Sequence, residues 1–196
     1  MSNVNYFGGE DIVPKGMERH LTYSAEDDQD IFPLYRVAVR DVFQALHNEI
    51  EKQIDPECHF ADIPFPTNPM IDVSPELLFY LVSYFYARFC YLSPYQRPYF
   101  TIEEEDDHIV LFKMVIQKGL CARFPHFKAL HQKANRLANI GNFIISIREE
   151  NNQELLCFRL SSKKRPTMIK LLTYSFAGVV EYVEKAFAAA KEDMGI

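Results

Sequence analysis

Six histidines and four cysteines are the residues of this 196-residue chain best suited to phosphoryl transfer or metal binding. His47 lies in Leu46-His47-Asn48-Glu49, beside the apolar positions of an expected helix. An exposed imidazole on a helix can accept a phosphoryl group, which makes His47 a candidate phosphoacceptor. The alternative is an ordinary surface histidine.

The cysteines stand singly at positions 58, 90, 121 and 157 and form no CxxC pair. Structural zinc sites usually use paired ligands at short, fixed spacing, whereas His126 and His131 do not share one helix face. We therefore expect no metal and no disulfide framework. Unpaired cysteines are typical of the reducing cytosol, so we expect a cytoplasmic protein.

Charge and hydropathy exclude two classes of partner. The chain has 21 Lys and Arg against 27 Asp and Glu, a net charge of −6, and a nucleic-acid binder would need a basic surface. No apolar run reaches the roughly 18 residues of a membrane span. With 48% hydrophobic residues the chain can bury a sizeable core.

The periodicity of apolar residues predicts the elements that would position these groups. Helices are expected at about 32–54, 75–92, 127–140 and from 167 onward, and hairpins at 99–103 with 109–116 and 143–148 with 155–160. The proline-rich stretch 55–74 should be a loop with at most an edge strand. This order predicts an α+β fold: a two-layer sandwich with a mixed or antiparallel sheet, helices on one face, and an extra C-terminal helix.

Several short segments, in this order and spacing, resemble the GHKL ATP-binding domain of sensor histidine kinases. They are Val73-Ser74-Pro75-Glu76-Leu77-Leu78, Tyr91-Leu92-Ser93-Pro94 and the run from Ala134 to Asn142. The resemblance covers roughly residues 32–160. We therefore divide the chain into an N-terminal arm (1–30), a histidine-kinase-like domain (31–165) and a C-terminal amphipathic helix (166–196).

The resemblance also implies that the ATP-binding residues are missing. The family's two nucleotide-facing asparagines would fall at Tyr84 and Arg88, its adenine-reading aspartate near Val115, and its flexible glycines reduce to Gly119. Arginine has only donors and a fixed positive charge, so Arg88 cannot coordinate Mg²⁺. We expect no cofactor, and a former nucleotide cavity filled by aromatic side chains. Arg88 should lie near its rim, paired to a carboxylate or stacked on a ring.

The predicted function is a non-catalytic signalling or regulatory module that acts through protein–protein contacts, with a response regulator or a kinase-like protein as partner. One alternative is a kinase-like enzyme that still binds nucleotide through substitute residues. Another is a histidine phosphotransferase that uses His47.

The expected C-terminal helix carries an apolar stripe that must be buried against something. Its members are Leu172, Phe176, Val179, Val183 and Phe187. The cover is either the aromatic helix 75–92 of the same chain or a second copy, and two-fold pairing favours a homodimer. Gly178 in mid-helix suggests close approach by a neighbour.

Overall fold

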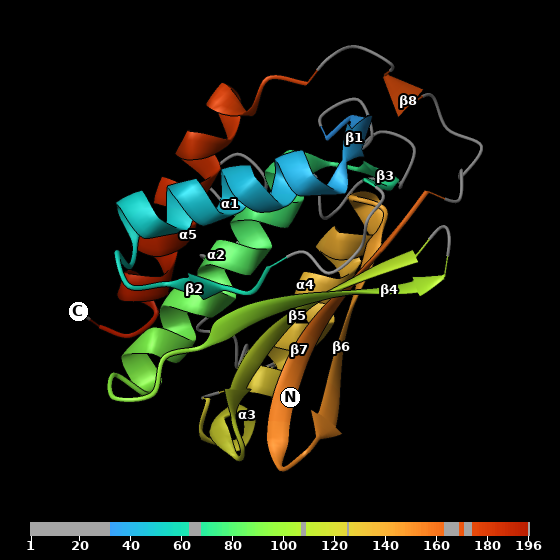
Figure 1. Ribbon diagram of the computed structural model, residues 1–196. Coiled ribbons are helices and arrows are strands. Elements are labelled where there is room, and N and C mark those ends of the chain that lie inside the picture. Colours follow the sequence, from blue (N-terminus) through green and yellow to red (C-terminus); the bar gives the residue numbers. More distant parts are fainter. Residues whose placement is uncertain are drawn as a thin grey trace, which may run out of the picture.

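The computed structural model describes residues 32–62, 68–106, 109–124, 126–162, 169–170 and 174–195. The expected arm and Leu172 lie outside these residues. Figure 1 shows a twisted sheet, helices against one face of it, and the C-terminal helix stacked on those helices.

The main sheet has five strands in the order β2-β4-β5-β7-β6. Its antiparallel part consists of β4 (Tyr99–Asp106), β5 (Ile109–Gln117), β7 (Gln153–Ser161) and β6 (Phe143–Glu150). The edge strand β2 (His59–Phe60) runs parallel to β4. Both expected hairpins are therefore confirmed, and the proline-rich stretch supplies the expected edge strand.

Three short strands that the sequence did not predict form a second sheet. Strand β1 (Leu34–Ala38) lies between β3 (Met70–Val73), which is antiparallel to it, and β8 (Ile169–Lys170), which is parallel. On this sheet, Arg36 Nε and Nη2 donate to the two carboxylate oxygens of Asp72 at 2.8 and 3.0 Å. The helix expected at 32–54 thus begins at Val39, because the first residues pair as a strand.

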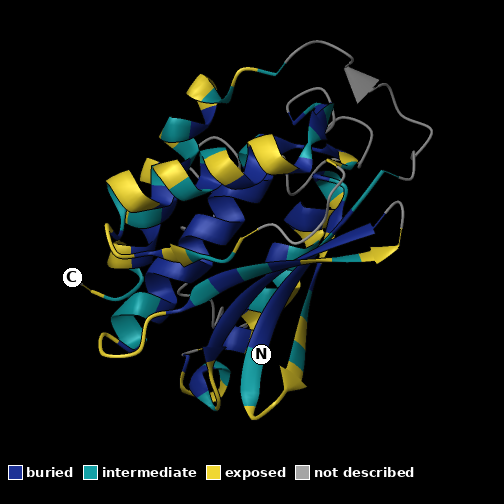
Figure 2. Cartoon of the chain, in the orientation of Figure 1, coloured by how far each residue is buried: buried dark blue, intermediate teal, exposed yellow. Residues whose placement is uncertain are grey.

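Helices α1 (Val39–Gln53), α2 (Pro75–Leu92) and α4 (Phe127–Ile140) pack on one side, and a short α3 (Leu120–Arg123) follows β5. Polar residues line the outward side of α1, which is exposed in Figure 2. The predicted fold class, an α+β sandwich with helices on one face and an extra C-terminal helix, is confirmed.

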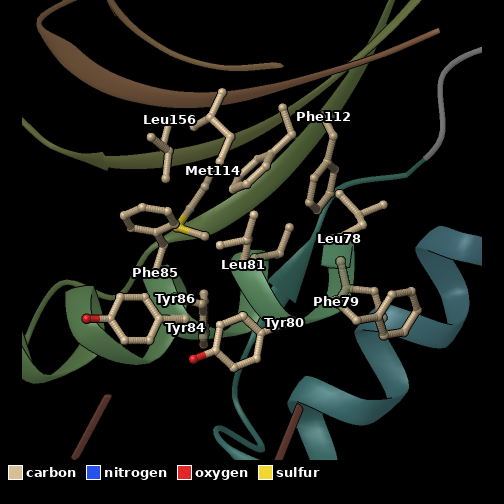
Figure 3. Close-up of a cluster of buried hydrophobic side chains, with 14 of the residues drawn as sticks. Leu78, Phe79, Tyr80, Leu81, Tyr84, Phe85, Tyr86, Phe112, Met114 and Leu156 are labelled. Carbon is tan, nitrogen blue, oxygen red and sulfur yellow. The ribbon is translucent and has the colours of Figure 1, made fainter. Parts of the chain in front are cut away.

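Helix α2 is buried on two sides. Leu78, Leu81 and Phe85 point toward Phe112 and Met114 of the sheet, whereas Tyr80 and Tyr84 point away from it (Figure 3). Every residue from Pro75 to Phe89 except Glu76 is buried. An apolar helix of this kind needs cover on the side away from the sheet.

The C-terminal helix supplies that cover, but it is shorter than predicted. The chain forms β8, then a 3-10 turn η4 (Phe176–Val179), and only then α5 (Val180–Glu192). Ser175 is extended (φ −96°, ψ 113°), which places Tyr174 against Tyr35 with ring centroids 4.6 Å apart. Gly178 lies in the turn, where an added Cβ would meet no atom within 4 Å, so the expected close approach at this glycine is wrong.

Candidate functional site

Two polar side chains of α2 project together on the side away from the sheet. Tyr84 and Arg88 are four residues apart, which places them one helical turn from each other. Their exposed fractions are only 0% and 3%, so neither lines an opening to solvent. Arg88 was expected at the rim of the former nucleotide cavity. That expectation is wrong, because an element other than α2 and the sheet covers Arg88.

That element is the end of α5. The Tyr84 hydroxyl donates a hydrogen bond to Asp193 Oδ2, and Arg88 Nη1 lies 3.4 Å from the same oxygen. The Arg88 guanidinium also sits over the Phe124 ring, 4.5 Å from its centroid. Arg88 is thus both paired to a carboxylate and stacked on a ring, which are the two contacts expected for it.

The positive charge of Arg88 is buried and must be compensated by its neighbours in this cluster. Arg88 Nε and Nη1 are buried and make no hydrogen bond within the described residues, so Asp193 and Phe124 are the groups that offset the buried positive charge. Burial raises the pKa of Tyr84, and the hydrogen bond to Asp193 and its negative charge raise this pKa further. Tyr84 therefore remains a neutral phenol that donates to Asp193 at ordinary pH.

The apolar stripe of the C-terminal segment packs on α2 beside this cluster. Phe176 stacks on Phe79 with ring centroids 5.9 Å apart, and Phe187 stacks on Tyr91 at 6.3 Å. Val179 and Val183 have no exposed surface in the single chain. These two valines are covered by their own domain, so they are not available to a second copy while α5 is docked.

A second polar contact fixes the start of this segment. The Tyr174 hydroxyl donates to Glu76 Oε1 at 2.9 Å, and the Ser74 hydroxyl donates to Glu76 Oε2 at 3.0 Å. Burial raises the pKa of Tyr174, and the Glu76 carboxylate adds to the shift. Contacts at both ends of α2 therefore hold the C-terminal segment across it.

Gly119 lies at the turn after β5 and does adopt a conformation that favours glycine, with φ +79°. Its N–H donates to Glu154 Oε1 at 2.9 Å, and the N–H of Cys121 donates to Glu154 Oε2 at 2.9 Å. The backbone donors of this turn are thus already satisfied by a carboxylate of the same chain. Nothing in the sequence marked Glu154 for this role, because it comes from another strand.

Val115 is not part of the cluster. Side chains alternate along β5, and those that face the helices are Phe112, Met114 and Ile116. Val115 packs on the opposite face of the sheet in a small group with Leu111, Leu155 and Cys157. The residue expected near the former adenine site therefore faces away from the helices, since a shift of one residue along a strand changes the face.

The remaining candidate residues lie apart from Tyr84 and Arg88. The His47 ring is half-buried on α1 and stacks on Phe60 with centroids 4.6 Å apart, rather than standing free on the helix. All four cysteines are unpaired thiols. Within the described residues, no three His, Cys, Asp or Glu side chains are gathered where they could share a metal ion, and none of the helices is long and apolar enough to cross a membrane.

Comparison with known proteins finds no matching family model and no curated relative. Among solved structures, the chain is similar to the histidine kinase AdeS of Acinetobacter baumannii, with 9% identity, 71% of this chain and 73% of that chain covered, and a TM-score of 0.44. It is also similar to the cytoplasmic segment of histidine kinase QseC, with 10% identity, 84% and 100% covered, and a TM-score of 0.47. A third match is histidine kinase ThkA in complex with the response regulator TrrA, with 10% identity, 83% and 53% covered, and a TM-score of 0.49. All three are histidine kinases, the class of protein whose ATP-binding domain the sequence resembles.

Proposed function

We propose that this chain is a non-catalytic binding module of a signalling system, a histidine-kinase-like domain that no longer binds ATP and acts through contacts with other proteins. One observation carries the proposal. Tyr84 and Arg88 stand at the positions that the resemblance assigns to the nucleotide, and both contact Asp193 of the chain's own C-terminal segment.

The chemistry of these side chains supports the loss of ATP binding. Arg88 is a buried cation, which would repel Mg²⁺ and has no lone pair to coordinate it. Entry of a nucleotide would also require α5 to leave α2, and this would expose Phe79, Tyr80 and Tyr84 to water. Glu154 accepts hydrogen bonds from the N–H groups of Gly119 and Cys121, so these two donors are not free for a phosphate.

The sequence resemblance makes a response regulator or a kinase-like protein the first class of partner to test. A homodimer remains a prediction, which sedimentation equilibrium of the full chain measures directly. The phosphotransferase alternative gains no support from His47, because its ring is half-buried against Phe60.

The decisive experiment is thermal unfolding with and without millimolar ATP and Mg²⁺. A ligand at a hundredfold excess over its Kd stabilises a fold by about 2.7 kcal/mol, which raises the Tm of a chain of this size by about 5–10 °C. We expect the two unfolding curves to coincide. A histidine kinase domain that binds ATP, measured in parallel, controls for the nucleotide and the metal.

A rise of several degrees in this protein would overturn the proposal and favour the nucleotide-binding enzyme. Arg88→Met would then separate the alternatives further, because it removes the cation without introducing the oxygen ligand of the family's asparagine. If nucleotide binds through substitute residues that include Arg88, this variant loses the rise.

A further inference from the structure

The charges of this acidic chain are distributed very unevenly. Residues 108–148 contain seven Lys and Arg and no Asp or Glu, whereas the rest of the chain carries 14 Lys and Arg against 27 Asp and Glu. A segment of this length without a carboxylate cannot neutralise its own cations. Each must find a partner elsewhere in the fold, or remain available to another molecule.

The cations on the sheet find partners within the fold. Lys113 pairs with Glu103 and lies 3.6 Å from Glu150, and Lys118 pairs with Glu149. Arg148 lies 3.5 Å from Glu105. These pairs are therefore satisfied internally by the acidic residues of the neighbouring strands.

Two of the three cations of α4, Lys128 and Arg136, behave differently. Lys128, Gln132 and Arg136 recur every four residues, so they share one outward face of the helix, and all three are exposed. Neither Lys128 nor Arg136 forms an ion pair within the described part of the chain, and no acidic residue lies on α4. Just before the helix, exposed Arg123 donates a hydrogen bond to the amide oxygen of Gln117, at 3.3 Å.

An exposed apolar side chain lies on the strand next to this face. Asn135 of α4 binds both the backbone N–H and the carbonyl of Ile145, each at 2.8 Å, and so fixes α4 along the edge strand β6. Ile147 lies two residues further on the same face of β6 and is 42% exposed. An exposed apolar side chain on the strand beside a helix face with unpaired cations is a combination found at protein interfaces, where apolar contacts lie within a polar rim.

We propose that the outward face of α4, defined by Lys128, Gln132 and Arg136 together with Ile147, is a docking surface for a carboxylate-rich face of another protein. This inference rests on the proposed function and names the chemistry of the partner. Charge complementarity selects an acidic partner, because Lys128 and Arg136 have no ion-pair partner among the residues that the structure describes. A protein is favoured over a nucleic acid, since the remaining surface is strongly acidic and would repel a polyanion that extends beyond the helix.

The test is fluorescence anisotropy of a labelled peptide of glutamate and aspartate around a central leucine, titrated with the full chain at low and physiological salt. The double variant K128Q/R136Q removes the two unpaired cations, and the double variant K52Q/K185Q removes two exposed lysines from α1 and α5 with the same change in net charge. We expect K128Q/R136Q to weaken binding about tenfold, since each exposed ion pair contributes a few-fold. The control variant should change it less than about twofold, and I147S should weaken it a few-fold while the protein still unfolds cooperatively, with at most a small fall in Tm.

Three outcomes would overturn the proposal. The first is no binding of the peptide at low salt, and the second is equal weakening by the two double variants, which would indicate diffuse attraction. The third is tighter binding of single-stranded DNA than of the peptide, lost in K128Q/R136Q, which would assign the face to nucleic acid. ATP-induced stabilisation tests the proposed function separately, so the two can fail independently.

Discussion

Asp193 is the carboxylate that pairs with the buried Arg88 across the α2–α5 contact. We expect Asp193→Asn to lower the free energy of unfolding by about 2–3 kcal/mol, since removal of one member of a buried pair leaves the other charge uncompensated. Thermal unfolding measures this as a fall in Tm of about 5–10 °C. Glu192→Gln, at the exposed neighbouring position, should leave the Tm unchanged.

Buried tyrosines make the protein sensitive to alkali. Burial raises the pKa of Tyr84 and Tyr86 above the ordinary value of 10.0, so the unfolded chain releases these phenolic protons first as the pH rises. Their contribution to stability is complete below about pH 10 and is lost as the pH rises above it. Urea unfolding from about pH 8 to about pH 11 should show a falling free energy of unfolding.

Substitution of single tyrosines identifies the source of this pH dependence. Tyr84→Phe removes one of the shifted phenols, so its stability should fall less steeply with pH than that of the wild-type chain. Tyr95→Phe is the matched control, because the Tyr95 side chain is fully exposed. An equal slope in all three proteins would contradict the assignment.

The sequence predicted part of this cluster for a clear physical reason. The proximity of Tyr84 and Arg88 follows from the helical repeat alone. Their partner Asp193 could not be predicted, because it lies 109 residues from Tyr84 and nothing local marks it. Val115 lies on the opposite face of β5. Because side chains alternate along a strand, a position assigned only approximately from sequence does not determine which face the residue is on.

At the scale of elements, α5 covers the side of α2 that faces away from the sheet and would otherwise contact solvent. We expect deletion of residues 174–196 to expose the aromatic side of α2, including Phe79 and Tyr91, which stack on η4 and α5. The truncated protein should aggregate or lose cooperative unfolding, as sedimentation velocity and thermal melts would show. A truncated chain that stays soluble and melts at an unchanged Tm would show that α5 does not cover the core.

One substitution in the turn η4 is expected to stabilise the folded protein. A Cβ at Gly178 would meet no atom within 4 Å, and φ is not in the positive region. We expect Gly178→Ala to raise the free energy of unfolding by about 0.4–1 kcal/mol, chiefly because the unfolded chain loses freedom. Gly141→Ala is the contrasting control, because its Cβ would lie 2.6 Å from a ring carbon of Phe143 and should destabilise the protein.

For the whole molecule, elements with a strong local pattern were predictable, and strands whose pairing is decided by distant parts of the chain were not. Helices α2 and α4 and the two hairpins follow from apolar periodicity and from end signals such as Ser74-Pro75. The strands β1, β3 and β8 have between two and five residues, and β8 depends on a partner far away in the chain. In such strands tertiary pairing, and not local pattern, decides the structure.

The long distance in sequence between α2 and α5, which covers it, has a consequence during synthesis on the ribosome. Ribosomes add about 5–20 residues per second, so Asp193 is made several seconds after Tyr84, 109 residues earlier. Through that interval the nascent chain carries a helix with aromatic rings on a side that nothing yet shields. Such an exposed aromatic surface favours aggregation until α5 docks on it.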